Sequence, residues 1–238
     1  ATVAVSVAIN GQDWAAETVV YDYVDTATVT AVYPTHGPMR GNTEVLVIGS
    51  NFVLSSSLAC QFGDSAVNVV PVAYFFNSSA VLCIAPPSFY DREVFVKVSN
   101  NGYFGEADIS ISDSVYSYDA AMSIKDVFPR LGPSTGNFSV RISGGPFNNT
   151  DELRCKFGHM QIQAYFIDSG SVVCWAPAHH AGVYPLELSN NDQDYTTERY
   201  PFLFYKNPTL SRISPVSGPA LQAGTEVAVY GNNFINSE

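Results

Sequence analysis

The sequence predicts an all-β protein made of tandem β-sandwich domains, with almost no helix. Strand-forming aromatic residues are frequent, with 14 Tyr and 15 Phe, and 17 Gly and 14 Pro divide the chain into short runs. A Pro-x-x-Gly-Pro motif begins at residues 34, 129 and 215, so it recurs after 95 and then 86 residues. That spacing is about the size of one small β-sandwich. No segment shows the 3.6-residue period of an amphipathic helix.

The composition limits the class of protein. Apolar residues make up 46% of the 238-residue chain and charged residues only 14%, which is typical of folded domains. The net charge of −11 argues against nucleic-acid binding, which needs a basic surface, and against an anionic membrane surface. No run approaches the roughly 20 apolar residues of a membrane-spanning helix, so we expect no membrane insertion in this segment. Without an initiator Met or a signal peptide, the chain is expected to start at a processed end or inside a longer protein.

Three copies of one strand pattern organise the chain. The first copy spans 32–52 and the third spans 213–234. Both contain Pro-x-x-Gly-Pro, then Thr-Glu-Val, then Gly-x-Asn-Phe. The middle copy, 127–147, is looser, because it has Thr-Gly-Asn before its strand and Gly-Gly-Pro-Phe at its end. Matches of this length indicate an internal repeat.

The four cysteines repeat in phase with this pattern. Cys60 and Cys155 each lie in Cys-x-Phe-Gly, whereas Cys83 and Cys174 each lie in Cys-x-Ala-Pro. One pair per period predicts the disulfides Cys60–Cys83 and Cys155–Cys174, each worth about 3 kcal/mol in the chain-entropy model. A zinc site would need Cys-x-x-Cys knuckles and a redox site a closely spaced pair. Disulfides place the protein in an oxidising compartment, outside the cell or on its surface.

The second half of each period also repeats. An alternating strand that ends in Asn-Gly or Asn-Asn occurs at 94–102, at 183–191 and at the start, 3–11, and aromatic strands close each copy at 19–23, 115–118 and 202–205. We therefore expect closing strands of a partial domain at 1–25, complete domains at 26–118 and 119–206, and opening strands of a partial domain at 207–238. The partial domains are completed either by a longer array or by neighbouring copies.

These motifs together resemble the IPT/TIG domain, the immunoglobulin-like fold of plexins, other cell-surface proteins and some transcription factors. The resemblance covers essentially the whole chain, and it is weaker in the middle copy. It implies tandem immunoglobulin-like β-sandwiches of the extracellular type. A DNA-binding member is disfavoured by the acidic charge and by the disulfides.

Three N-glycosylation sequons fit an extracellular protein, at Asn77, Asn137 and Asn148. N-linked glycans are the only non-protein groups that we expect, and we predict no cofactor. Asn77 and Asn148 lie in polar, turn-like sequence and are better candidates than Asn137. A short pattern of this kind also arises by chance in a chain rich in Asn and Ser.

No catalytic or metal site is predicted, so the chain is expected not to be an enzyme. His36 stands at a turn position, and the pair at 179–180 lies in a predicted loop without a recurring carboxylate partner. Asp192-x-Asp194 lacks the dense acidic loop of calcium sites. Trp14 and Trp175 are interpreted as core or inter-sheet packing residues, and the alternative is that they are sugar-stacking platforms.

Two classes of function are open at this point. The first is an extracellular structural or adhesive protein, whose domains form a filament, coat or stalk by stacking end to end. The alternative is a receptor ectodomain, similar to that of plexins, that presents a ligand-binding module. The expected partners are copies of the chain or adjacent repeats, head to tail. Short linkers without Gly/Ser tracts suit both classes, and an accessory domain of an enzyme would have its chemistry elsewhere.

Overall fold

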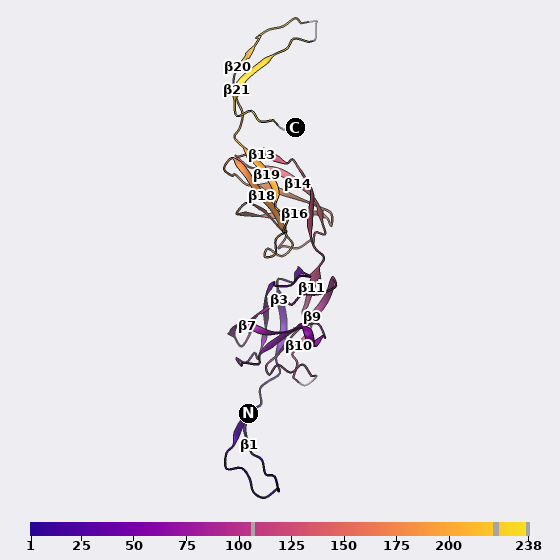
Figure 1. Ribbon diagram of the computed structural model, residues 1–238, viewed down its shortest axis with the longest axis vertical. Helices are drawn as coiled ribbons and strands as arrows, with labels where there is room; N and C mark the ends of the chain where they lie inside the picture. The colour runs from indigo at the N-terminus through magenta and orange to yellow at the C-terminus, as the bar shows by residue number, and fades with distance from the viewer. Residues whose placement is uncertain (106–107, 221–223, 237–238) are drawn as a thin grey trace. The chain divides into compact units, whose positions relative to one another are not determined.

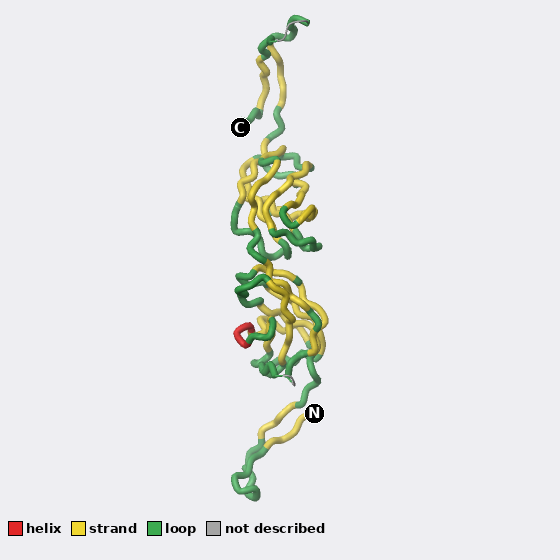
Figure 2. The backbone as a smooth tube through the Cα atoms, turned by 90° about the vertical axis from the view of Figure 1, so that its right-hand side faces the viewer, coloured by secondary structure: helices red, strands yellow, loops and turns green. Residues whose placement is uncertain are grey.

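A computed structural model describes residues 1–105, 108–220 and 224–236. It confirms the all-β prediction, since the only helical segment of the described residues is the 3₁₀ turn η1 (Ala66–Asn68). Strands and loops make up the rest of the tube in Figure 2. The chain divides into two compact units, Ala1–Asp119 and Ala120–Glu238, and each contains one β-sandwich and one separate hairpin.

The strands of the first unit are joined by turns and by longer loops (Figure 1). They are β1 (Thr2–Val5), β2 (Val19–Asp22), β3 (Thr28–Tyr33), β4 (His36–Pro38), β5 (Glu44–Ser50), β6 (Ala59–Phe62), β7 (Val69–Asn77), β8 (Ala80–Ile84), β9 (Arg92–Ser99), β10 (Ile111–Ser112) and β11 (Val115–Asp119).

The second unit has counterparts of β3–β9 and β11 in the same order, followed by a hairpin. Its strands are β12 (Ser123–Phe128), β13 (Leu131–Pro133), β14 (Phe138–Gly145), β15 (Arg154–Phe157), β16 (Met160–Asp168), β17 (Ser171–Ala176), β18 (Gly182–Ser189), β19 (Tyr200–Tyr205), β20 (Thr209–Ser214) and β21 (Ala228–Asn232).

Each sandwich consists of two layers that share one long strand. In the first unit β10, β3, β5 and β8 form one layer, β6, β9, β11 and β4 form the other, and β7 pairs with both β8 and β6. In the second unit β12, β14 and β17 face β15, β18, β19 and β13, and β16 is shared. Inward side chains of both layers form the two cores, which include Val45, Val47, Phe62, Val96 and Tyr116 in one unit. Ile142, Phe157, Leu186, Phe202 and Phe204 lie in the other core. This immunoglobulin-like arrangement is the one that the sequence predicts.

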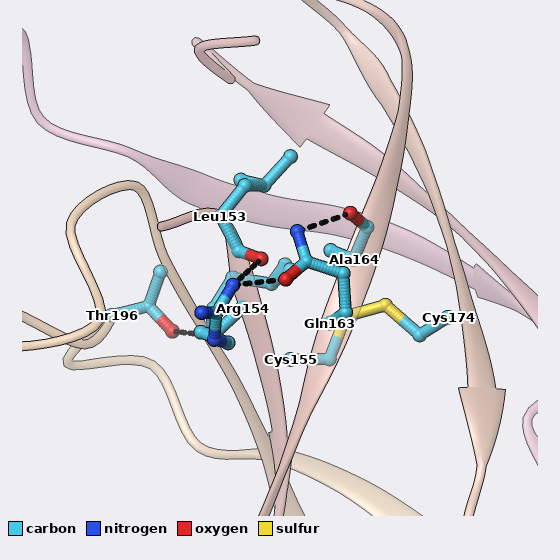
Figure 3. Close-up of a disulfide and its surroundings, with 8 residues drawn as sticks. Leu153, Arg154, Cys155, Gln163, Ala164, Cys174 and Thr196 are labelled. Atoms are coloured by element: carbon cyan, nitrogen blue, oxygen red, sulfur yellow. Dashed lines mark hydrogen bonds between the residues drawn. A yellow bond between two sulfur atoms is a disulfide. The ribbon is translucent and has the colours of Figure 1, made fainter. Parts of the chain in front are cut away.

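The disulfides lie where the shared strand changes layers. β16 pairs with β15 as far as Gln163 and with β17 from Ala164 onward. Cys155 on β15 and Cys174 on β17 flank this point, fully buried, with their Cα atoms 6.4 Å apart (Figure 3). Each bridge therefore ties one layer to the other beside the strand that already joins them.

The first sandwich has the same arrangement. Pro71 is the last residue of β7 that pairs with β6, and Val72 is the first that pairs with β8. Proline has no N–H for a continuous ladder, which suits a position where the pairing changes. Cys60 on β6 and Cys83 on β8 are joined across this point, again with 6.4 Å between Cα atoms.

The Pro-x-x-Gly-Pro motif carries the chain from one layer to the other. In the first unit it joins β3 to β4, and β4 pairs in parallel with β11 of the opposite layer. Gly37 passes directly over an aromatic side chain, because a Cβ added there would lie 1.9 Å from the Tyr116 hydroxyl oxygen. Gly132 lies equally close to the ring of Phe138, so a side chain at either position would have to displace an aromatic side chain.

The Gly-x-Asn-Phe motif brings the first two long strands together. A Cβ on Gly49 would lie 1.8 Å from the Thr28 carbonyl oxygen, and Asn51, at φ 60°, donates from its side chain to the Thr26 carbonyl at 3.0 Å. The hairpin β20–β21 repeats this geometry: Gly231 would meet the Thr209 carbonyl oxygen at 1.8 Å, and Asn233 has φ 62°. The third sequence copy therefore folds locally like the first.

Two hairpins lie outside the sandwich cores. β1 pairs antiparallel with β2, and β20 pairs antiparallel with β21. The residues of β1, β2 and β20 are all exposed, and so are those of β21 apart from half-buried Gly231. The assignment of these hairpins as the closing and opening strands of further sandwiches stays a prediction.

Removing the second bridge should weaken the second sandwich. For Cys155→Ala with Cys174→Ala we expect a loss of about 3 kcal/mol in the free energy of unfolding, because the unfolded chain regains the entropy of an open loop. Urea denaturation followed by Trp175 fluorescence, in a Trp14→Phe background, measures this loss for the second sandwich. Reductant should lower the stability of the parent protein to that of the variant, and it should leave the variant unchanged. Equal stability of parent and variant would contradict the prediction.

Gly49→Ala should separate β3 from β5. The added Cβ would overlap a backbone carbonyl that cannot move without breaking the sheet pairing, so we expect a loss of roughly 2 kcal/mol or more. Thermal unfolding measures the change in Tm. Gly105→Ala is the control, because a Cβ there meets no atom within 4 Å. A Gly49 variant as stable as the Gly105 variant would show that the contact is not needed.

Candidate interaction surfaces

The residues considered above as possible metal-binding or catalytic groups lie in the following settings. Within residues 1–105, 108–220 and 224–236, three or more His, Cys, Asp or Glu side chains nowhere come together as a possible metal site. His179 lies among aromatic rings. Its ring centroid is 3.8 Å from that of Tyr184 and 5.1 Å from that of Phe204. His36 Nδ1 lies 3.3 Å from Asp119 Oδ1, so this histidine pairs with a carboxylate of β11.

The residues of Asp192-x-Asp194 have structural partners in the loop after β18. The side-chain oxygen of Asn191 accepts hydrogen bonds from the Gln193 and Asp194 backbone, at 3.1 and 2.8 Å, and its amide donates to Asp194 Oδ2 at 2.9 Å. Asp192 pairs with Arg154 at 3.4 Å. Asn10 makes the same set of bonds with Gln12 and Asp13 in the hairpin β1–β2. The acidic residues therefore shape a repeated turn.

The acidic surface contains isolated ion pairs. Lys97 Nζ lies 2.8 Å from Asp64 Oδ1, and this hydrogen bond lowers the pKa of the Asp64 carboxyl. An Arg130 guanidinium nitrogen lies 2.8 Å from Asp126 Oδ1, and this hydrogen bond likewise lowers the pKa of the Asp126 carboxyl. Exposed pairs of this kind add little stability.

The outer face of the first sandwich carries a row of apolar side chains. Tyr33, Leu46, Leu82 and Tyr74 stand opposite one another on four adjacent strands, β3, β5, β8 and β7. Tyr74 is 58% exposed, and its ring centroid lies 4.7 Å from that of Phe76, which is 52% exposed. We call Tyr74 and Phe76 the aromatic pair. An exposed apolar face of this kind is typical of contact with another molecule.

The second sandwich repeats this row with different side chains. Phe128, Arg141, Val173 and Tyr165 stand opposite one another on β12, β14, β17 and β16. Trp175 lies two residues from Val173 on the same face and is 51% exposed, so its expected role as a packing residue is wrong. Trp14, in the hairpin β1–β2, is exposed as well. Strand alternation could have located both rows, but it does not say which face of a strand is solvated.

The three predicted sequons lie in different settings. Asn77 is exposed at the end of β7, in the turn to β8. Asn137 is exposed at φ 63°, immediately before β14. Asn148 is half-buried in the loop after β14. Each of the three asparagines therefore lies in its own turn or loop.

In the described ranges, no helix combines the length and the hydropathy needed to cross a membrane.

Known proteins similar to this chain include plexins and a fibrocystin-like protein. A family model described as the IPT/TIG domain matches residues 27–118 and 122–204. Human Plexin-A3 is 22% identical over 211 residues, which cover 87% of this chain and 11% of the relative. Mouse Plexin-A4 is 24% identical over 233 residues, 90% of this chain and 12% of the relative. Mouse Fibrocystin-L is 25% identical over 207 residues, 87% of this chain and 4% of the relative.

A solved structure of the full extracellular region of Plexin A4, domains 1 to 10, has the same fold. Its TM-score is 0.52 at 19% identity, and the match covers 87% of this chain and 18% of that one. The chain spans only 4 to 12% of the length of these three curated relatives. The family model, in contrast, matches well over half of the chain, in the two segments that form the sandwiches. The chain therefore belongs to the IPT/TIG domain family.

Proposed function

We propose that this chain is a non-enzymatic segment of an extracellular receptor stalk, in which successive IPT/TIG domains carry a ligand-binding module away from the membrane. The observation that carries the proposal is the match to plexins along 87 to 90% of the chain, although the chain spans only 11 to 12% of those relatives. A segment of this kind is one part of a long ectodomain. The partners are then adjacent repeats of the same polypeptide.

The topology of each sandwich supports a role as a spacer. β10 begins beside the start of β3, with Ile111 opposite Thr28, and β11 ends beside the end of β4, with Asp119 opposite Pro38. The first and last strands are thus parallel, so the polypeptide starts at one end of the sandwich and leaves at the other. In the second unit β13 pairs in parallel with β19, and Pro133 stands opposite Tyr205. Domains with opposite termini extend a chain with each repeat.

The connection between the sandwiches is short. Asp119 ends β11 and Ser123 begins β12, which leaves residues 120–122 between them. A linker of this length without glycine restricts the relative motion of two domains. The paired cysteines fit an oxidising environment outside the cell.

The structural filament expected from the sequence has less support than the receptor alternative. Exposed hairpin faces and repeated domains are compatible with both functions. The plexin relatives favour a repeat array within one chain over association of separate chains by end-to-end stacking. We therefore do not propose a filament or a coat.

The proposal is tested on the intact protein in its own cells. An epitope tag at the end of the native polypeptide allows it to be followed through surface labelling with a membrane-impermeant biotin reagent and through stepwise extraction. We expect labelling on intact cells and release by detergent but not by high salt, because a receptor is held in the membrane outside this segment. A protein that escapes labelling, or that is recovered from the medium as sedimenting polymers, would contradict the proposal.

A further inference from the structure

We propose that Asn77 carries an N-linked oligosaccharide, and that its first N-acetylglucosamine packs on the aromatic pair, Tyr74 and Phe76. The inference rests on the passage through the secretory pathway that the proposed function also requires. The acceptor is the side-chain amide of Asn77, and the donor is an oligosaccharide linked to a polyisoprenyl pyrophosphate. A bond forms between Asn77 Nδ2 and C1 of the first sugar, the C1–O bond to pyrophosphate breaks, and the amide loses one proton. The lipid pyrophosphate leaves.

The turn at Asn77 presents both halves of the acceptor. The backbone N–H and the hydroxyl of Ser79 both donate to Asn77 Oδ1, at 2.8 and 2.7 Å. Neither bond uses Nδ2, the atom that would carry the sugar, and the side chain is exposed. The hydroxyl of the sequon therefore contacts the amide that it serves, in the exposed turn between β7 and β8.

The equivalent turn of the second sandwich shows which groups of the Asn77 turn are needed to form the hairpin and which are not. There Asp168 takes the place of Asn77, and its Oδ1 accepts a 2.8 Å bond from the Gly170 N–H. A side-chain oxygen alone therefore suffices to form this turn. The amide nitrogen of Asn77 and the hydroxyl of Ser79 are not needed for the hairpin, and they are the two groups that glycosylation needs.

The Asn148 sequon has a structural explanation instead. The Thr150 hydroxyl donates to the Asn190 carbonyl at 2.9 Å, and the Asn148 backbone N–H donates to the Asn190 side chain at 3.1 Å. In the first sandwich Ser55 and Val53 make the same two bonds to Asn100, at 2.8 and 3.0 Å, although no sequon is present there. The Thr150 hydroxyl is thus part of a loop anchor, and half-buried Asn148 leaves less room for a sugar.

Asn137 also has a counterpart outside any sequon. Asn42 has φ 68° and Asn137 has φ 63°, and their backbone N–H groups donate to Ala85 and Ala176 at 2.9 and 2.8 Å. The left-handed turn before the second long strand therefore explains an asparagine here, since Asn tolerates positive φ. In the Asn77 sequon, by contrast, the Ser79 hydroxyl is bonded to the side-chain amide of the same sequon.

The aromatic pair lies on the same face as Asn77. Tyr74 stands opposite Leu82, and the register then shifts so that Asn77 stands opposite Ala80, with Phe76 in a β-bulge between them. A bulge places two residues against one on the partner strand, so Phe76 and Asn77 share the outer face with Tyr74. The C–H face of a sugar on these rings would remove apolar surface from water. The second sandwich has Ile167 in place of Phe76.

Site occupancy tests the first half of the inference. The full chain is secreted from animal cells, the glycans are released enzymatically in ¹⁸O-water, and each ¹⁸O-labelled aspartate that replaces a glycosylated asparagine is quantified by peptide mass spectrometry. We expect Asn77 to be occupied in most molecules, several-fold more than Asn148. Asp168→Asn with Gly170→Ser transfers the acceptor to the matching turn, and it should add a glycan. A secreted chain without sugar at Asn77 would overturn the inference and leave the proposed function standing. Retention inside the cell would contradict the shared requirement for secretion.

Thermal unfolding tests the packing on the aromatic pair. Glycans trimmed to one N-acetylglucosamine should give a Tm about 3 °C above that of the fully deglycosylated chain. Full enzymatic removal converts Asn77 to the residue type that the second sandwich has at 168, so the hairpin itself stays intact. In Tyr74→Ser with Phe76→Ser the difference should vanish. An equal Tm shift with and without the aromatic pair would overturn the packing.

Discussion

The fold depends on one strand in each sandwich that belongs to both layers. β7 and β16 pair first with one sheet and then with the other, and the change occurs within a single step, at Pro71–Val72 and at Gln163–Ala164. A buried disulfide closes the two neighbours of that strand across the same point. The shared strand and the disulfide thereby set the spacing of the layers. They do so independently of the Pro-x-x-Gly-Pro turn that also carries the chain from one layer to the other in each sandwich. Those turns can then be built from glycines that touch aromatic rings.

Sequence reasoning recovers the parts of this design that need one particular residue type. Gly49 and Gly231 lie against carbonyl oxygens, and no side chain fits there, so the motif persists in both copies. The middle copy differs in residue order but makes the same close approach. A Cβ added to Gly144 would lie 2.0 Å from the Ser123 carbonyl oxygen, so glycine occupies this position as well. The recurrence of one cysteine pair in each repeat and the alternation of apolar residues along a strand are also visible in the sequence. The disulfides and the strands could therefore be predicted from it.

The surface is less predictable, because alternation assigns strand residues to two faces without naming the buried one. Trp175 has the size of a core residue, and only its place on β17, two positions from Val173, shows that it points outward. His36 lies near Asp119 only because β4 pairs with β11, across 83 residues of sequence. Contacts of this range follow from topology, which no local motif specifies.

The internal repeat supplies a comparison that a single domain lacks. Where both sandwiches have the same bond with different residues, the bond belongs to the fold: Ser55 and Thr150 anchor one loop in the same way. Where one sandwich has groups that its counterpart does without, the fold does not explain them. The amide nitrogen of Asn77 and the hydroxyl of Ser79 are of this second kind, since Asp168 and Gly170 build the same turn. Differences between copies therefore indicate function more sharply than the motifs that the copies share.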